Sequence, residues 1–411
     1  MGAVLVSVWR VRDFRLVWAG QALSSFGNGV SQLAYPLLAL ALTGSAAVAG
    51  ALAAVRALPY LVLGLPAGAL VDRWDRRRTM VLCDLGRAVN MATVPVALAL
   101  SALTPAHLFV TGFVGGVLHV FFSAAENAVL PNVVGKDQLT GAVSAAETAQ
   151  AATGVLAGPV GGALLQVFRG LPFLVDAVSF LASALCLSLV RADFRGEPAR
   201  SRDGLRAEIG EGVRWLWGHR ALRSIAVTAA GLQVAISGVA LVAIVAARHA
   251  SPAAIGGLFA ALGVGGVVGA VIAPKLKARM GLFRLLLAVV WLQGVLWVAL
   301  AFADGLVAVG VVLALFTVSM PCFGVAALSY QLEVTPDHLL GRVGATFGLL
   351  IWAATPVGAA AAGLLLDLVT PRTTSLLLAG WVVVLGVVST RVLSRRARGS
   401  GFVGHQEGLA G

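Results

Sequence analysis

The sequence predicts an all-α integral membrane protein with twelve transmembrane helices in two six-helix bundles. Three observations lead to this fold class. The chain is 59% hydrophobic and only 12% charged, with a mean hydropathy of +0.93, whereas soluble domains have about 25% charged residues. Its apolar runs last about 20 residues, the length of a helix that crosses a bilayer. Its positive charges lie almost entirely in alternate loops.

The apolar runs are expected to be helices. Spans in lipid must be helices or strands of a closed barrel, because lipid cannot bind backbone polar groups. Barrel strands alternate polar and apolar residues, and stretches such as 285–302 and 306–320 do not alternate. We therefore expect helices near residues 14–40, 46–71, 79–101, 106–131, 140–166, 172–191, 222–246, 253–274, 282–302, 306–331, 340–367 and 373–393.

The positive residues predict the orientation of these helices. Of the 30 Lys and Arg residues, 25 fall in the loops and termini of one side, and Arg169, Arg248 and Arg372 fall on the other. Positive residues mark the cytoplasmic side of a membrane protein. We therefore expect a multi-pass protein of the cell membrane with both termini in the cytoplasm. The asymmetry also accounts for the basic composition without a nucleic-acid partner.

The longest polar stretch, residues 191–223, separates the two sets of six spans. The expected divisions are an N-terminal bundle (1–190), a cytoplasmic linker (191–221), a C-terminal bundle (222–395) and a cytoplasmic tail (396–411). In the linker, apolar residues recur at helical spacing between charged ones, which predicts an amphipathic helix at the membrane surface. A segment that binds a protein partner is the alternative.

The two halves share sequence. Six of twelve positions are identical between Val134–Ala145 and Val334–Ala345. Further along each half, Gly158-Pro159-Val160-Gly161 is matched by Thr355-Pro356-Val357-Gly358. Two matches in the same order indicate a duplication. A duplicated set of six helices is the parallel repeat of many secondary transporters.

The loop between the second and third predicted helices carries the most specific motif. It reads Gly68-Ala-Leu-Val-Asp72-Arg73-Trp-Asp75-Arg76-Arg77-Arg78. This resembles the signature G-x-x-x-D-R-x-G-R-R/K-x of the major facilitator superfamily, matched at Gly68, Asp72, Arg73, Arg76 and Arg77. Asp75 stands where the pattern has Gly. The aspartate at this position, the segment Arg56-Ala-Leu-Pro59 and the segment Asp176–Phe180 resemble the sequences of one subgroup, the drug- and macrolide-efflux and enterobactin-exporter proteins.

The resemblance covers residues 13–391 and implies a role for the loop. Asp72 and Arg73 are expected to hold the two halves together when the cytoplasmic side is closed, and Gly68 to permit close helix contact. The alternative is that the arginines only fix the topology. The corresponding segment of the second half, residues 269–275, lacks the Asp, so this contact is expected on one side only.

The predicted fifth helix carries Gly154, Gly158, Pro159 and Gly162. These residues resemble the antiporter motif, although Ala163 replaces its last Gly. Small residues four positions apart allow close helix contact, and proline permits a bend. A hinge associated with export and ordinary packing both fit this pattern.

Six ionisable residues lie within predicted spans of the first half. A charge inside a membrane is costly, so each is a functional hypothesis. Asp84 and Arg87 are three residues apart and are expected to pair on one helix face. The pairing of Arg56 with Asp176 is a looser hypothesis. Glu126 and Glu147 fit either a proton or cation role or a structural one.

The first predicted helix has a polar face of Gln21, Ser24, Asn28 and Ser31. This face is a candidate substrate path, and hydrogen bonds between helices are the alternative. His119, alone in an apolar run, is a weaker candidate for coupling.

The sequence contains no Walker loop, metal cluster, nucleophile triad or dinucleotide fingerprint. We therefore expect neither an enzyme nor a cofactor. The expected function is that of a proton-coupled exporter (an antiporter) of a small amphipathic compound such as a drug, antibiotic or siderophore. Its expected partners are the lipid bilayer, the substrate and protons, and it is expected to be a monomer. The alternatives are an importer of a small solute, a lipid flippase, and a non-transporting sensor or scaffold.

Overall fold

The computed structural model describes residues 8–71, 73–135, 138–191 and 205–397, and within them the regular structure is entirely helical. The first half contains α2 (Arg12–Thr43), α3 (Ala46–Val71), α4 (Arg76–Ala99), α5 (Pro105–Val133), α6 (Leu139–Val167) and α7 (Leu171–Ser188). After α8 (Leu205–Gly218), the second half contains α9 (Arg220–Ala246), α10 (Pro252–Met280), α11 (Leu282–Ala301), α12 (Gly305–Val334), η2 (Asp337–Leu339), α13 (Leu340–Leu368) and α14 (Pro371–Ala397).

The all-α membrane fold predicted from the sequence is confirmed. Among the described residues, ten helices are long and apolar enough to cross a membrane. The long helices α2 and α6 are not among the ten. Both carry polar residues along their length, including Asn28 in α2 and Glu147 in α6. Polar side chains lower the hydropathy of a helix without shortening it, and these two helices flank the cavities described below.

Local caps define several helix ends. The Asp75 carboxylate accepts a hydrogen bond of 3.0 Å from the backbone N–H of Arg78 at the start of α4. Ser251 caps α10 in the same way through Ala254. Side-chain oxygens at this position satisfy a backbone donor that the helix leaves free. The Asp at position 75, where the loop signature has Gly, therefore serves as a helix cap.

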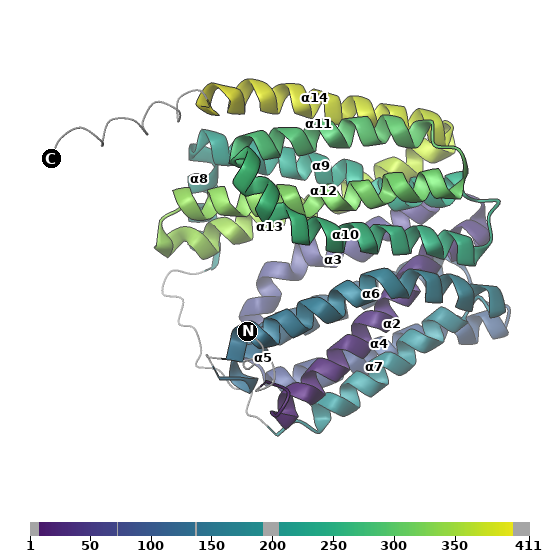
Figure 1. Ribbon diagram of the computed structural model, residues 1–411. Helices are drawn as coiled ribbons and strands as arrows, with labels where there is room; N and C mark the ends of the chain where they lie inside the picture. The colour runs from purple at the N-terminus through teal and green to yellow at the C-terminus, as the bar shows by residue number, and fades with distance from the viewer. Residues whose placement is uncertain (1–7, 72, 136–137, 192–204, 398–411) are drawn as a thin grey trace.

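The helices form two halves that meet along two helix pairs (Figure 1). Within the first half α2 packs on α7 and α3 on α5, and within the second half α9 packs on α13 and α10 on α12. Between the halves, α3 packs on α13 and α6 packs on α10. The start of α2, the end of α14 and the helix α8 lie at the same end of the molecule (left in Figure 1). We call this end the terminal face and the other end the opposite face.

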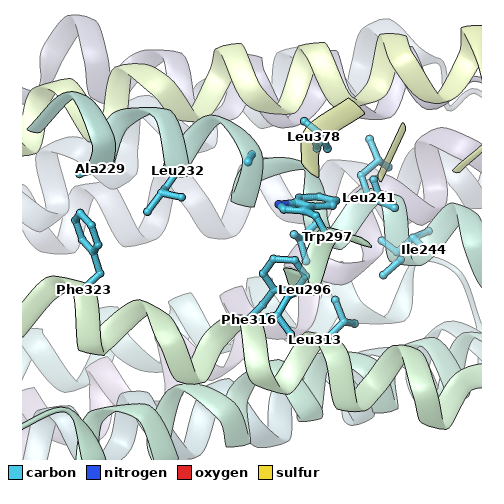
Figure 2. Close-up of a cluster of buried hydrophobic side chains, with 14 of the residues drawn as sticks. Ala229, Leu232, Leu241, Ile244, Leu296, Trp297, Leu313, Phe316, Phe323 and Leu378 are labelled. Carbon is cyan, nitrogen blue, oxygen red and sulfur yellow. The ribbon is translucent and has the colours of Figure 1, made fainter. Parts of the chain in front are cut away.

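The second half has a well-packed aromatic centre. Trp297 of α11 is fully buried, and its ring lies 5.2 Å from that of Phe316 in an edge-to-face arrangement. Leu241, Ile244 and Leu378 surround this pair (Figure 2). Buried aromatic pairs contribute large apolar areas and an additional ring–ring attraction. The second half thus has an apolar interior, whereas the ionisable groups lie in the first half.

Candidate substrate cavity

A cavity of about 460 Å³ lies between the two halves. Its walls come from α2, α3, α4, α5 and α7 of the first half and from α9, α10 and α13 of the second. The first half contributes the ionisable groups Arg56, Arg87, His119 and Asp176. The second half contributes Gln233, Ser237, Thr355 and Trp352, so its wall is polar or aromatic without charge. A mixed wall of this kind suits a small amphipathic ligand.

Arg87 and Asp84 form a buried ion pair within α4, as the spacing predicts. Their side chains are 5% and 0% exposed. The guanidinium carbon of Arg87 also lies 4.2 Å from the centroid of the Phe122 ring and 4.3 Å from that of the Phe180 ring. These contacts bind α4 to α5 and α7. Because Arg87 is paired with Asp84, is buried and contacts two aromatic rings, the geometry favours a structural role for this pair.

Arg56 has a different environment. Its guanidinium carbon lies 4.1 Å from the centroid of the Tyr35 ring. No ion pair or hydrogen bond of this side chain occurs in the described part of the chain. Its aliphatic stem passes α5 at Gly112, where an added Cβ would lie 2.7 Å from the Arg56 Cγ. The absence of a side chain at position 112 therefore gives Arg56 its path to the cavity wall.

Asp176 is bound by hydroxyl groups instead of by Arg56. The Ser31 hydroxyl donates to its carboxylate at 2.6 Å, and Ser179 lies at 3.5 Å from its other oxygen. The side chain is buried but lines the cavity. The hypothesis that Arg56 and Asp176 form an ion pair is therefore wrong for this conformation, because each group has its own partner on α2.

The polar face of the first helix divides between two cavities. Asn28 and Ser31 line the central cavity. Gln21 lines a second cavity of about 500 Å³ between α2, α5 and α6, together with Glu126 and Glu147. Ser24 is buried and lines neither. Gln32, which lies off the predicted face, also lines the central cavity.

The glycines of α6 bring the halves together on the opposite-face side of the cavity. A Cβ added at Gly158 would lie 2.9 Å from the backbone oxygen of Gly256, and one at Gly162 would lie 3.0 Å from the Cα of Ala253. Gly154 faces Gly263 one turn earlier. On the other helix pair, a Cβ at Gly50 would lie 2.8 Å from the Cα of Gly363. These positions pack helices of different halves, and Pro159 lies within the same contact.

Hydrogen bonds of Asp367 with Ser45 and Ala46, which we call the Asp367 clasp, accompany this packing. The Asp367 carboxylate at the end of α13 accepts hydrogen bonds from the Ser45 hydroxyl at 2.5 Å and from the backbone N–H of Ala46 at 2.6 Å. Both donors lie at the beginning of α3. The negative charge also interacts favourably with the amino end of that helix. The halves are therefore closed against each other at the opposite face.

The loop signature lies at the terminal face, and Asp72 is outside the described residues. Arg73 is exposed, and Arg76 is half-buried. Arg77 donates to the backbone oxygens of Leu187 and Ser188 in α7 of its own half. A Cβ added at Gly68 would have open space around it. In this conformation the contacts of α3 with the second half lie near its other end, so the close helix contact expected at Gly68 when the terminal face is closed stays a prediction.

Two features of the site were missed in the sequence. The polar group of Gln233 and Thr355, joined by a hydrogen bond of 3.1 Å, emerged only from the structure. Asp367 was also overlooked, although an aspartate at the end of the predicted span 340–367 was a visible signal. The 191–221 linker does contain a helix, α8, whose Glu211 pairs with Arg342 of α13.

The family model described as Major Facilitator Superfamily matches residues 17–353. The chain belongs to this superfamily. A multidrug efflux pump, Tap, of Mycolicibacterium fortuitum is 32% identical over 380 residues, covering 88% of this transporter and 91% of that protein. Macrolide efflux protein A of Streptococcus pyogenes is 27% identical over 207 residues, about half of each chain.

Solved structures agree on the fold. The transporter superposes on a mutant form of the nucleoside transporter NupG with a TM-score of 0.80 at 12% identity, covering 92% of this chain and 99% of that one. A bacterial homologue of the iron transporter ferroportin, in an inward-facing state, gives a TM-score of 0.75 at 19% identity and covers 93% and 99% of the two chains. At these identities the likeness concerns the fold alone. The superfamily consists of transporters, so the protein is a membrane transporter and not an enzyme.

Proposed function

We propose that this transporter exports small amphipathic compounds, including drugs, from the cytoplasm in exchange for protons. The observation that carries the proposal is the cavity between the halves. It is closed at the opposite face by the Gly158–Gly256 contact and the Asp367 clasp, and its wall combines aromatic and aliphatic groups with few charges. The likeness to Tap over nearly the whole chain supports export as the direction.

The orientation follows from the positive charges. The terminal face contains Arg73 before α4, Arg76, Arg77 and Arg78 at the start of α4, and Lys277 and Arg279 at the end of α10. Positive residues favour the cytoplasmic side. With the terminal face in the cytoplasm, the structure corresponds to a state that is closed toward the outside. Such a state is the one in which an exporter takes up its substrate.

Asp176 is the proposed site of proton exchange. It combines a buried carboxylate, a place on the cavity wall and hydroxyl partners that accommodate either the charged or the neutral form. A carboxylate that loses its proton toward the cytoplasm and regains one from outside would link proton entry to substrate exit. In this proposal Glu126 and Glu147, which line the second cavity, carry protons toward the terminal face.

The domain division proposed for the chain assigns 1–190 and 222–395 to the bundles, 191–221 to the linker and 396–411 to the tail, in a monomeric protein. The helix α8 supports the linker assignment. Light scattering of the detergent-solubilised protein tests the monomer, because the protein mass after subtraction of detergent should equal that of one 42.0 kDa chain.

Transport in liposomes tests the function. Purified protein is reconstituted, a pH gradient is imposed, and the movement of erythromycin, tetracycline and ethidium is followed. We expect at least one compound to move against its gradient when the proton gradient is present, and Asp176→Asn to abolish this coupling. Asp304→Asn, a change at an exposed carboxylate outside the cavity, is the matched control. If the movement of every compound were the same with and without the pH gradient, proton-coupled export would be contradicted.

A further inference from the structure

The strongest unexplained feature of the cavity is the charge of Arg56. An arginine inside a membrane protein ordinarily pairs with a carboxylate or with backbone oxygens, because an uncompensated charge away from water is costly. Arg87 follows this rule through Asp84. Arg56 does not, since in the described part of the chain its contact is with the Tyr35 ring.

The geometry leaves the binding edge of Arg56 open. Tyr35 covers one face of the guanidinium plane, and this ring is itself fixed against Phe173 at 4.9 Å. A ring below the plane stabilises the cation but uses none of its N–H groups. Gly112 lets the stem of the side chain reach the cavity wall. Arg56 therefore offers a planar set of N–H donors to whatever occupies the cavity.

No carboxylate of the described residues forms an ion pair with Arg56, although the Asp176 carboxylate interacts with it electrostatically over a longer distance. Asp176 from α7 is bound to Ser31 and Ser179, Arg87 from α4 is paired with Asp84, and His119 from α5 carries no negative charge. The walls from α9, α10 and α13 contribute uncharged residues. Because the Asp176 carboxylate is held by Ser31 and Ser179, the N–H groups of Arg56 remain open to an oxyanion from a ligand, and guanidinium binds such groups through two parallel hydrogen bonds.

We propose that Arg56 is a specificity-determining residue that binds an oxyanion, such as a carboxylate or phosphate, carried by an amphipathic substrate. The apolar part of that substrate would lie toward Met91 of α4, Phe259 of α10 and Trp352 of α13, which line the same cavity. This inference rests on the proposed function only in taking the central cavity as the substrate path. It narrows the substrate class from amphipathic compounds in general to those with an acidic group.

Binding of two matched probes tests the proposal. The purified protein in detergent is titrated with 9-anthracenecarboxylate and, separately, with its uncharged amide, by equilibrium dialysis. The two probes have the same ring system and nearly the same size. We expect wild type to bind the carboxylate at least about tenfold more tightly, the ratio typical of a charge-assisted hydrogen-bond pair. We expect Arg56→Gln to remove this preference while binding of the amide persists.

Two further variants make the result specific. Arg56→Lys retains the positive charge but loses the planar guanidinium that donates two parallel hydrogen bonds. It should therefore keep part of the preference for the carboxylate probe and show that the site remains folded. Arg372→Gln is the matched control, because Arg372 also lies over an aromatic ring, Phe302 at 4.2 Å, but outside the cavity. This control should keep the wild-type preference. Equal binding of both probes by wild type, or an unchanged preference in Arg56→Gln, would overturn the proposal.

The same assay identifies the source of the oxyanion and separates this inference from the transport mechanism. Displacement of the carboxylate by dihexanoyl phosphatidylglycerol would assign the site to a lipid phosphate, and failure to displace it would assign the site to a soluble acid. No proton gradient is present in the assay. A preference that depends on Arg56 therefore supports the site even if proton-driven export fails in liposomes, and loss of the preference leaves an observed export activity intact.

Discussion

Asp367 at the end of α13 and Ser45 at the start of α3 join the two halves of the molecule. The Ser45 hydroxyl and the neighbouring Ala46 N–H both donate to the same carboxylate, at 2.5 and 2.6 Å. Next to them, the backbones of Gly50 and Gly363 approach too closely to admit a side chain at either position. These contacts must break when the transporter opens at the opposite face, so they contribute to the balance between its two conformations.

Removing the charge of Asp367 should shift that balance toward opening at the opposite face. Asp367→Asn loses the charge at the amino end of α3, and an exposed cap of this kind contributes about 1 kcal/mol, or a roughly fivefold population shift. Spin labels at Ala102→Cys and Asp304→Cys, in opposite-face loops of the two halves, would report the change as a larger fraction of long distances in a variant without the native cysteines. Ser45→Ala, which retains the bond to Ala46, should shift the balance less. An unaltered distance distribution in Asp367→Asn would show that the clasp has no effect on the equilibrium.

The loop signature should act in the reverse direction. If Asp72 holds the terminal faces together in the other conformation, Asp72→Asn should increase the population that is open at the terminal face and slow transport. The same label pair would then show fewer long distances than wild type. Combining Asp72→Asn with Asp367→Asn should bring the distribution back toward that of wild type. Unimpaired transport by Asp72→Asn would leave the loop with a role in topology alone.

Two adjacent glycines of α10 provide a test of the interhalf packing. A Cβ at Gly256 would lie 2.5 Å from the backbone oxygen of Gly158, whereas a Cβ at Gly257 would have open space. Overpacking of this kind costs about 1–3 kcal/mol. Gly256→Ala should therefore reduce transport and lower the melting temperature in detergent, and Gly257→Ala should change neither. Equal effects of the two substitutions would argue against a close α6–α10 contact.

The Asp84–Arg87 pair should be essential for stability, even though it lies beside the cavity. Arg87→Gln leaves Asp84 buried without a counter-charge, a loss of about 3–5 kcal/mol for buried pairs in general. We expect a clear fall in the melting temperature, which is measured by intrinsic tryptophan fluorescence. The double variant Asp84→Asn with Arg87→Gln should recover much of it, because no unpaired charge remains. A double variant less stable than Arg87→Gln alone would contradict a purely structural pair.

Most of the fold could be predicted from the sequence. The predicted span 46–71 coincides with α3, and 140–166 differs from α6 by one residue at each end. This agreement has a physical basis, because a helix in lipid must be apolar and of fixed length, and polar residues mark its ends. The ion pair of Asp84 with Arg87 was equally accessible, since residues three apart on one helix face meet whatever the rest of the fold does.

The candidate site could be predicted only in part. The polar face of α2 is visible in the sequence, yet Asn28 reaches the central cavity and Gln21 a second one. Which cavity a residue faces depends on how neighbouring helices cross α2, and spacing along one helix contains no information about that. Contributions of α9 and α13 such as Gln233 and Trp352 are single residues in apolar runs, without a local pattern.

The sequence by itself determined the class of protein and the family signature, and it predicted twelve spans and a duplication, with ten helices of the described residues long and apolar enough to cross a membrane. These features depend on residues close together in the chain and on the energetic cost of polar groups in lipid. Only the tertiary structure decided that Arg56 and Asp176 have separate partners, that Gly158 faces Gly256, and that Asp367 binds the start of α3. The partners in each case lie on different helices, and their distances depend on how whole helices pack against one another.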